Sequence, residues 1–473
     1  MFAKTKSYPT TKPLTMKSSR SEIHRKYHGL PILRFEDQQM TSFAGLVVFQ
    51  RLFEHLKLKH RIRRCFRHVK VSPIFGHASI VLLLVIHMLL GYRELRHLRF
   101  YDDDPLVRRL LGLKRLPDVA TISRTLSAMD EQSVERFQDL VGSLVLERIA
   151  ELGLQRITLD FDGSVIGTGR YAEGTAVGFN RKKKGQRSYY PLFCTVAQTG
   201  QVLDVHHRSG NVHDSNGAQD FILNCIEQVR IALPKVLIEV RMDGAFFSDE
   251  IVTALDEAGI EYTISVPFER FSELKGQIEK RQIWYRLNEQ CDFFESAWKP
   301  KSWQRRYRFI FVRQLSRVQY KKPVQLDLFV PYEYGYEFKV VLTNKSMTSA
   351  RVVAFHNGRG SQEGIFAELK SQNQMAYVPT RTWRGNQIYL LSAVMAHNLT
   401  RELQMVAREP ARTTLQKRPA LWGFEQIATL RRRIIQRAGR LIRPKGKLTL
   451  SMNANEAVKN ELLHYLDAID KIA

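Results

Sequence analysis

The order of the predicted elements after Arg156 constrains the fold of this chain more than any other feature. Residues Ile157–Asp162 alternate apolar and polar, as a half-buried strand does, and the alternation stops at Gly163. Strand-like segments follow at Tyr190–Ala197 and Val202–His207, a helix is expected over 214–232, and a strand over Val236–Asp243. A helix from Ser248 and a strand near Tyr262–Val266 come next. Three strands in a meander, then helix, strand, helix, strand, predict an α/β fold with a mixed sheet flanked by helices.

The remaining chain divides around this core. Residues 1–150 are expected to be a helical, basic region, and the core to begin at 151 and run to 269. Residues 270–335 are predicted to be a β-rich insertion, with strand-like segments at Ile283–Leu287, Tyr307–Val312 and Val324–Val330. The core is expected to resume over 336–410, where Ile388–Leu403 has the composition of a buried helix. Residues 411–473, which include the basic run Leu430–Lys447, are expected to form a basic C-terminal tail.

The charge of the chain points to a polyanionic partner. Its 73 Lys and Arg against 47 Asp and Glu give a net charge of +26, far more than solubility requires. A membrane is disfavoured, because the most apolar run, Ile80–Leu90, is too short to span a bilayer. The four Cys form no CxxC pair, and no signal peptide is recognisable, so a reducing cytoplasm and association with the nucleoid are expected. The run Lys57–Lys70, with seven Lys or Arg and no acid, is either a solvated face or a surface that follows phosphates.

Two short predicted helices near 105–129 resemble a helix-turn-helix. Asp104-Pro105 and Pro117-Asp118 are typical helix starts, in which the Asp caps the helix, so capping explains the Asp102–Asp104 triplet better than a metal does. In the second helix, Thr121 and Arg124 are expected on the face toward a DNA groove.

Carboxylates mark the ends of two predicted strands. Asp160 and Asp162 share one side of the first strand, and Asp243 closes a later one; a Gly follows directly after Asp162 and after Asp243. Ligands of open α/β sheets bind at the carboxyl ends of strands, although an Asp there can also simply terminate the strand. A helix over 356–372 brings Glu363, with Arg359 and Lys370 on the same face, and Glu368 is expected at the surface. Three converging carboxylates need cations, and hard oxygen ligands suit Mg²⁺, or Mn²⁺ in its place, as a pair of ions for phosphoryl transfer.

At this point the chain resembles the bacterial insertion-sequence transposases, which carry an Asp-Asp-Glu triad on a ribonuclease-H-like core. It looks closest to the family usually labelled thirteen-eighty. The resemblance is carried by LDFDGSV at Leu159–Val165, VRMDGAFFSDE at Val240–Glu250, and the helix motif Tyr, two residues, Arg, three residues, Glu, six residues, Lys. Here His356 stands where Tyr is usual.

The resemblance implies a function and a set of site residues. Asp162, Asp243 and Glu363 would be catalytic metal ligands, with Asp160 as the alternative to Asp162, while Arg359, Lys370 and His356 would contact DNA phosphates. Further DNA contacts are expected from a basic loop and two aromatic residues of the insertion, each of which has a plain surface or packing role as its alternative: Arg181, Lys182, Lys183, Lys184, Arg187, Trp298 and Trp303.

The implied protein is a DNA transposase that binds the inverted-repeat ends of its element, cleaves them and joins them to target DNA, as a homodimer in the synaptic complex. The alternatives are a nuclease on the same core that never joins DNA, and a non-catalytic DNA-binding protein.

Overall fold

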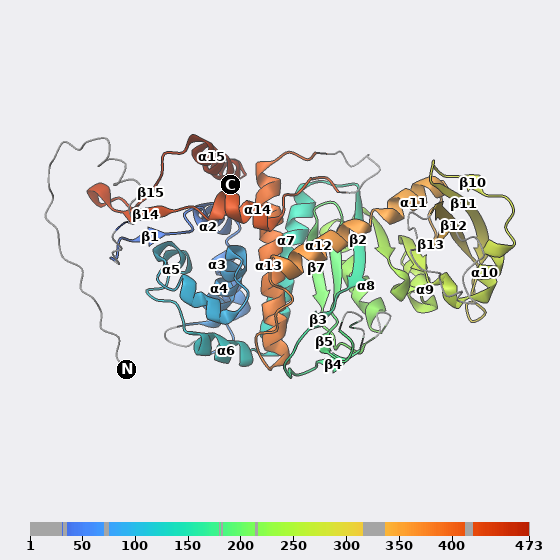
Figure 1. Ribbon diagram of the computed structural model, residues 1–473, viewed down its shortest axis with the longest axis horizontal. Helices are drawn as coiled ribbons and strands as arrows, with labels where there is room; N and C mark the ends of the chain where they lie inside the picture. Colours follow the sequence, from blue (N-terminus) through green and yellow to red (C-terminus); the bar gives the residue numbers. More distant parts are fainter. Residues whose placement is uncertain are drawn as a thin grey trace. The chain divides into compact units, whose positions relative to one another are not determined.

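The computed structural model describes residues 31, 36–70, 75–178, 180, 183–212, 216–315, 336–411 and 420–472. The chain divides into a unit over Met1–Gln39 and a unit over Met40–Ala473. Every helix and strand named below belongs to the second unit (Figure 1). The strand-like segment Val324–Val330 lies outside the described residues, as do Arg181 and Lys182.

The expected helical region is present ahead of the sheet. Its elements are α2 (Leu46–His55), α3 (Leu58–Cys65), α4 (His77–Leu90), the 3₁₀ turn η1 (Leu95–Phe100), α5 (Pro105–Leu111), α6 (Val119–Ser127) and α7 (Glu131–Glu151). Asp104 caps α5 by accepting from the backbone N–H groups of Leu106 and Val107 at 3.0 and 3.1 Å, so its predicted capping role is confirmed. In the part of the chain that the structure describes, no helix is long and apolar enough to cross a membrane. The apolar run Ile80–Leu90 is instead buried in the protein core.

The central sheet has nine strands in the order β10-β11-β12-β13-β9-β8-β2-β6-β7. Five of them are the strands expected from the sequence: β2 (Arg156–Gly163), β6 (Leu192–Val196), β7 (Gln201–His206), β8 (Leu237–Met242) and β9 (Glu261–Val266). β2, β8 and β9 run parallel, whereas β6 is antiparallel to β2 and β7 is antiparallel to β6. This order and these directions are those of a ribonuclease-H-like sheet, so the predicted fold class is confirmed.

Helices cover both faces of this sheet. On one face Phe161 of β2 packs edge-on against Phe221 of α8 (Ala218–Ala232), and α9 (Asp249–Glu257) belongs to the same hydrophobic cluster. On the other face Phe193 of β6 contacts Phe366 of α12 (Gly360–Ser371). Because side chains alternate along a strand, and Asp162 pairs in register with Phe193, the acids of β2 lie on the α12 face.

The segment predicted to be an insertion, together with the strand that follows it, extends the core sheet. β13 (Tyr336–Thr343) pairs antiparallel with β9, and β12 (Tyr307–Leu315), β11 (Cys291–Trp298) and β10 (Tyr285–Arg286) continue outward from it. The 3₁₀ turn η3 (Phe268–Arg270) and α10 (Ser272–Glu279) connect β9 to this extension. A second, three-stranded sheet of β3 (Ile166–Gly167), β4 (Ala176–Val177) and β5 (Arg187–Tyr189) lies in sequence between β2 and β6.

The region expected to be a basic tail is folded over residues 420–472, which corrects that prediction. After the core helix α13 (Trp383–Ala407) come α14 (Ile427–Leu430), the π-helical turn η4 (Arg431–Ile435), β14 (Gly439–Ile442), η5 (Pro444–Gly446), β15 (Thr449–Met452) and α15 (Glu456–Lys471). β14 pairs with β15 and with β1 (Met40–Thr41) (Figure 1). Leu462, Tyr465 and Ile469 are buried on one face of α15. This apolar stripe at helical spacing, interleaved with charged residues, is the reason that the region folds.

Candidate active site

Two acids lie at the carboxyl ends of neighbouring parallel strands. The pairing of β2 with β8 ends at Phe161 opposite Met242, so Asp162 and Asp243 are the next residue of each strand. Adjacent strands are about 4.8 Å apart, which brings both residues to the same edge of the sheet. Asp243 caps the 3₁₀ turn η2 (Gly244–Phe246) by accepting from the Ala245 N–H at 2.9 Å. Asp162 accepts from the Gly163 N–H at 2.8 Å.

The predicted helix over 356–372 is two helices, α11 (Ser349–Asn357) and α12, joined at Gly358 and Arg359. Both linking residues keep right-handed helical angles, so the chain turns tightly without extending. The buried Gln362 donates from Nε2 to the carbonyl of Asp160 at 3.0 Å, and Arg359 donates from Nη1 to Oδ2 of Asp162 at 3.1 Å. These two contacts hold the start of α12, and with it the exposed Glu363, against the end of β2.

The donor set at this edge has the chemistry of a site for a hard divalent cation. Asp162, Asp243 and Glu363 supply carboxylate oxygens, the ligands that Mg²⁺ and Mn²⁺ prefer. Among the residues described, however, no three His, Cys, Asp or Glu side chains are close enough together to hold a metal ion. The guanidinium of Arg359 takes up the negative charge of Asp162 here. The three carboxylates therefore suit a divalent cation by residue type, and ion binding requires them to come closer together.

Asp160 has a different environment from Asp162, although both face α12. Its two oxygens accept from Nε and Nη2 of Arg241 at 2.6 and 2.7 Å, and both side chains are at most 1% exposed. Arg241 also donates to the carbonyl of Phe355 in α11 at 2.9 Å. Burial raises the pKa of Asp160, and the neighbouring Arg241 opposes that rise. Asp160 is buried in this ion pair, whereas Asp162 lies partly exposed at the end of β2, so Asp162 is the more accessible of the two carboxylates.

His356, predicted to contact DNA, is buried and serves α11 packing instead. Its Nε2 lies 2.8 Å from the Ser265 hydroxyl and its Nδ1 lies 3.0 Å from the Thr263 hydroxyl, both on β9. Burial lowers the pKa of His356 well below its ordinary value, so the ring is neutral. A neutral side chain that is 2% exposed and bonded through both nitrogens is not placed to contact a phosphate.

Glu368, expected at the surface, is also buried. It pairs with Arg401 of α13 at 2.5 Å and accepts from the Ile427 N–H at 2.9 Å, which ties α12 to α13 and to the C-terminal region. Lys370, on the same helix, is partly exposed.

Lys339 of β13 is a site residue that the sequence did not indicate. It donates from Nζ to Asn357 Oδ1 at 3.1 Å. Burial lowers the pKa of Lys339, Arg359 lowers it further and Glu363 raises it, so Lys339 lies within electrostatic reach of both side chains. No motif contains Lys339, because it reaches the site through the pairing of β13 with β9.

The other predicted DNA contacts come from other elements. Lys183 and Lys184 are exposed, as is Arg187 on β5, which donates to the hydroxyl and carbonyl of Thr175. On α6, Arg124 is exposed and donates to the Thr121 hydroxyl at 3.3 Å.

Trp298 and Trp303 are buried, which agrees with the packing alternative and not with stacking on a DNA base. Trp298 donates to Glu273 at 3.2 Å, and Trp303 stacks on Phe247 with ring centroids 4.7 Å apart. Their aromatic faces are used in the core of the sheet extension.

Comparison with known proteins agrees with a site of this type. Residues 31–473 match the family described as Transposase DDE domain group 1, and the chain belongs to this family. The solved structure of a piggyBac transposase synaptic complex with hairpin DNA is 12% identical, with a TM-score of 0.38 over 76% of this chain and 74% of the other. The Mos1 transposase paired-end complex is also 12% identical, with a TM-score of 0.18 over 36% and 56%.

TM-scores this low describe a distant likeness only, and the fold assignment rests on the strand order instead. No curated protein sequence matches the chain. Membership of the family makes the protein a DDE transposase by class.

Proposed function

We propose that this protein is the transposase of a bacterial insertion sequence, close to the thirteen-eighty family. It would bind the terminal inverted repeats of its element, cleave DNA strands there and join the freed 3′ ends to target DNA. The observation that carries this proposal is the position of Asp162 and Asp243 at adjacent strand ends, with α12 fixed beside them by Gln362 and Arg359. The spacing of Arg359, Glu363 and Lys370 supports the finer assignment.

Asp162, Asp243 and Glu363 would hold two Mg²⁺ or Mn²⁺ ions. When bound, such ions supply an activated water or 3′-hydroxyl and stabilise the leaving oxygen of an in-line displacement. Arg359 would leave Asp162 for a DNA phosphate, since a guanidinium pairs with either anion. Lys370, partly exposed further along α12, would bind a neighbouring phosphate.

The partner would be double-stranded DNA, both as element ends and as target. The net charge of +26 supports this, because a surface rich in Lys and Arg gains affinity by releasing the counterions of DNA. Two ends must meet for joining, so a homodimer is proposed for the synaptic complex, in the cytoplasm at the nucleoid. The exposed Arg124 of α6, together with the basic loop at Lys183 and Lys184, would add contacts to DNA.

A strand-transfer assay tests this proposal. Labelled DNA carrying the repeats that flank the gene is incubated with protein, Mg²⁺ and a plasmid, and cleaved and joined products are separated. Asp243→Asn and Glu363→Gln should each reduce cleavage by about a thousandfold, since ligand loss removes several kcal/mol of charge stabilisation. Glu250→Gln, which neutralises an exposed acid on α9, is the matched control and should retain activity.

Three outcomes discriminate among the hypotheses. Cleavage followed by joined plasmid supports a transposase. Cleavage without any joined product supports the nuclease. Cleavage that is unchanged in Asp243→Asn contradicts the proposed site.

A further inference from the structure

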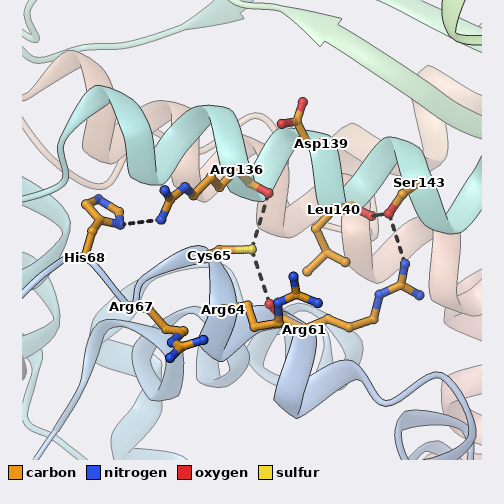
Figure 2. Close-up of a pocket in the computed structure, with 9 residues that line it drawn as sticks. All are labelled: Arg61, Arg64, Cys65, Arg67, His68, Arg136, Asp139, Leu140 and Ser143. Atoms are coloured by element: carbon orange, nitrogen blue, oxygen red, sulfur yellow. Dashed lines mark hydrogen bonds between the residues drawn. The ribbon is translucent and has the colours of Figure 1, made fainter.

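A basic cleft lies between α3 and α7, apart from the proposed metal site. It measures about 740 Å³ and is lined by Arg61, Arg64, Cys65, Arg67, His68, Arg136, Asp139, Leu140 and Ser143 (Figure 2). Arg61 and Arg64, three residues apart on α3, lie on one side of the helix, facing α7, and His68 follows in the turn after α3. From the sequence, the basic run Lys57–Lys70 was expected to be either a solvated face or a surface that follows phosphates.

The floor and one end of the cleft are fixed by contacts between the two helices. The buried Cys65 donates from Sγ to the carbonyls of Arg61 and Arg136, at 3.4 and 3.3 Å. Burial raises the pKa of Cys65 to about 11, so it stays a neutral thiol with a structural role. At one end, Arg61 donates to Ser143 at 3.2 Å and pairs with Glu147, which neutralises it. α3 is thus held at a fixed position along α7.

The uncompensated positive charge belongs to Arg64, Arg67 and Arg136. In the described part of the chain, neither Arg64 nor Arg67 pairs with a carboxylate, and both are exposed. Arg136 donates to Nδ1 of His68 at 3.1 Å, while Nε2 of the same ring contacts Asp130. Figure 2 shows Asp139 on the side of α7 that points away from the α3 side chains. Arg64, Arg67 and Arg136 therefore give the lining of the cleft a net positive charge.

We propose that this cleft binds the sugar-phosphate backbone of duplex DNA without regard to base sequence. A guanidinium presents a planar fork of donors that matches two phosphate oxygens, and the Arg64 and Arg67 guanidiniums lack a carboxylate partner here. The exposed Lys57, Arg63 and Lys70 continue the basic surface. α3 alone is about 12 Å long, more than one phosphate spans, which favours a polymer over a small anion. The inference extends the proposed function, because it names a second DNA surface besides α6.

The test is the salt dependence of binding to random-sequence duplex DNA, which does not require the end sequence to be known. The full chain is titrated with labelled duplex at several NaCl concentrations, and log Kobs is plotted against log [NaCl]. Each lost phosphate contact lowers the magnitude of the slope by about 0.9. The double variant Arg64→Ala, Arg67→Ala should therefore lower it by about 1.8 and weaken binding by roughly tenfold or more at ~0.1 M salt.

Two variants control for charge and for folding. Lys235→Ala with Lys280→Ala removes the same charge from exposed positions outside the cleft and should leave the slope nearly unchanged. Arg64→Lys with Arg67→Lys keeps the charge and should keep most of the slope. An unchanged slope in the alanine variant overturns the inference. So does an equal loss in the lysine variant, because damage to the fold would then be the cause.

Outcomes for the two proposals are separable. If the wild-type chain never cleaves element ends but the alanine variant loses slope, the cleft proposal stands and the proposed function fails. If wild-type protein joins ends normally and the alanine variant keeps its slope, only the cleft proposal fails.

Discussion

Two acids on β2 show how position within a strand decides the role of a residue. Asp160 and Asp162 are two residues apart on one face, yet Asp160 is buried against Arg241 and Asp162 lies where the strand ends. A buried ion pair costs about as much desolvation as it returns in attraction, so it adds little net stability. Breaking it by removing one partner leaves an uncompensated buried charge, which is costly.

We therefore predict that Asp160→Asn lowers the free energy of unfolding by about 3–5 kcal/mol, because Arg241 is left buried without a counter-charge. Asp162→Asn, at a partly exposed position, should change stability by less than about 1 kcal/mol while abolishing cleavage. Urea denaturation followed by tryptophan fluorescence measures both. A stable Asp160→Asn protein that has lost only activity would make Asp160 a metal ligand after all.

Elements were predictable where their signals are local. The strands β2, β6, β7, β8 and β9 were expected from strand-like segments of the sequence, and α5 and α6 from their capping residues. The sequence did not predict the break between α11 and α12, because Gly358 has ordinary helical angles. The reason for a Gly here is a close approach to Arg241, which is distant in sequence. A Cβ at Gly358 would lie 2.3 Å from Nη1 of Arg241, and only the folded chain reveals that approach.

This difference predicts opposite signs for two glycine substitutions. Gly358→Ala should destabilise by about 1–3 kcal/mol, since Arg241 is locked by Asp160 and cannot move aside. Gly364→Ala, in α12 with no atom within 4 Å of the new Cβ, should stabilise by about 0.5–1 kcal/mol.

Thermal unfolding of the two single variants beside the wild-type protein measures this pair. Gly358→Ala should also reduce cleavage, because it shifts the start of the helix that carries Glu363. Equal melting temperatures for the two variants would mean that the linker tolerates a side chain.

At the scale of the whole molecule, sequence reasoning missed the return of the C-terminal region. The pairing of β1 with β14 joins Met40 to Arg440, and no local pattern encodes a contact between residues so far apart in the chain. The basic residues of 430–447 also dominated the composition there and hid the apolar stripe of α15 that follows. Likewise, Trp298 and Trp303 gave no local sign that β12 and β13 would bury them.

The folded C-terminal region predicts a contrast within one helix. Ile469 is fully buried where α15 packs near α2 and α13. Changing Ile469 to Ala should lower the free energy of unfolding by about 2–5 kcal/mol. Leu463 is 45% exposed on the same helix, so Leu463→Ala should lower the free energy of unfolding by less than about 1 kcal/mol. Guanidinium denaturation of both variants tests whether this region belongs to the main core. If both variants lose similarly little free energy of unfolding, α15 does not belong to the main core.

The last prediction concerns histidines that are buried and neutral in the folded protein. Burial lowers the pKa of His87, His207 and His397 to about 3 and that of His356 well below its ordinary value of 6.5. Below pH 6.5 the unfolded chain therefore binds protons that the folded chain does not, and stability falls as pH falls. Each of these histidines lowers the free energy of unfolding by about 1.4 kcal/mol per pH unit below 6.5. The four together therefore lower it by roughly 5–6 kcal/mol at pH 5.5.

That loss is comparable to the whole stability of an ordinary domain, so unfolding should begin between pH 6 and 5. Burial raises the pKa of Asp160 and Asp204, so these acids bind protons more readily in the folded state than in the unfolded chain and offset part of the loss. Urea denaturation at pH 7.5, 6.5 and 5.5 measures the slope. His397→Gln keeps a donor for the Gly200 carbonyl but cannot titrate, so its slope should be about a quarter smaller. Equal slopes would show that His397 titrates freely, and hence that α13 opens to water more readily than its burial indicates.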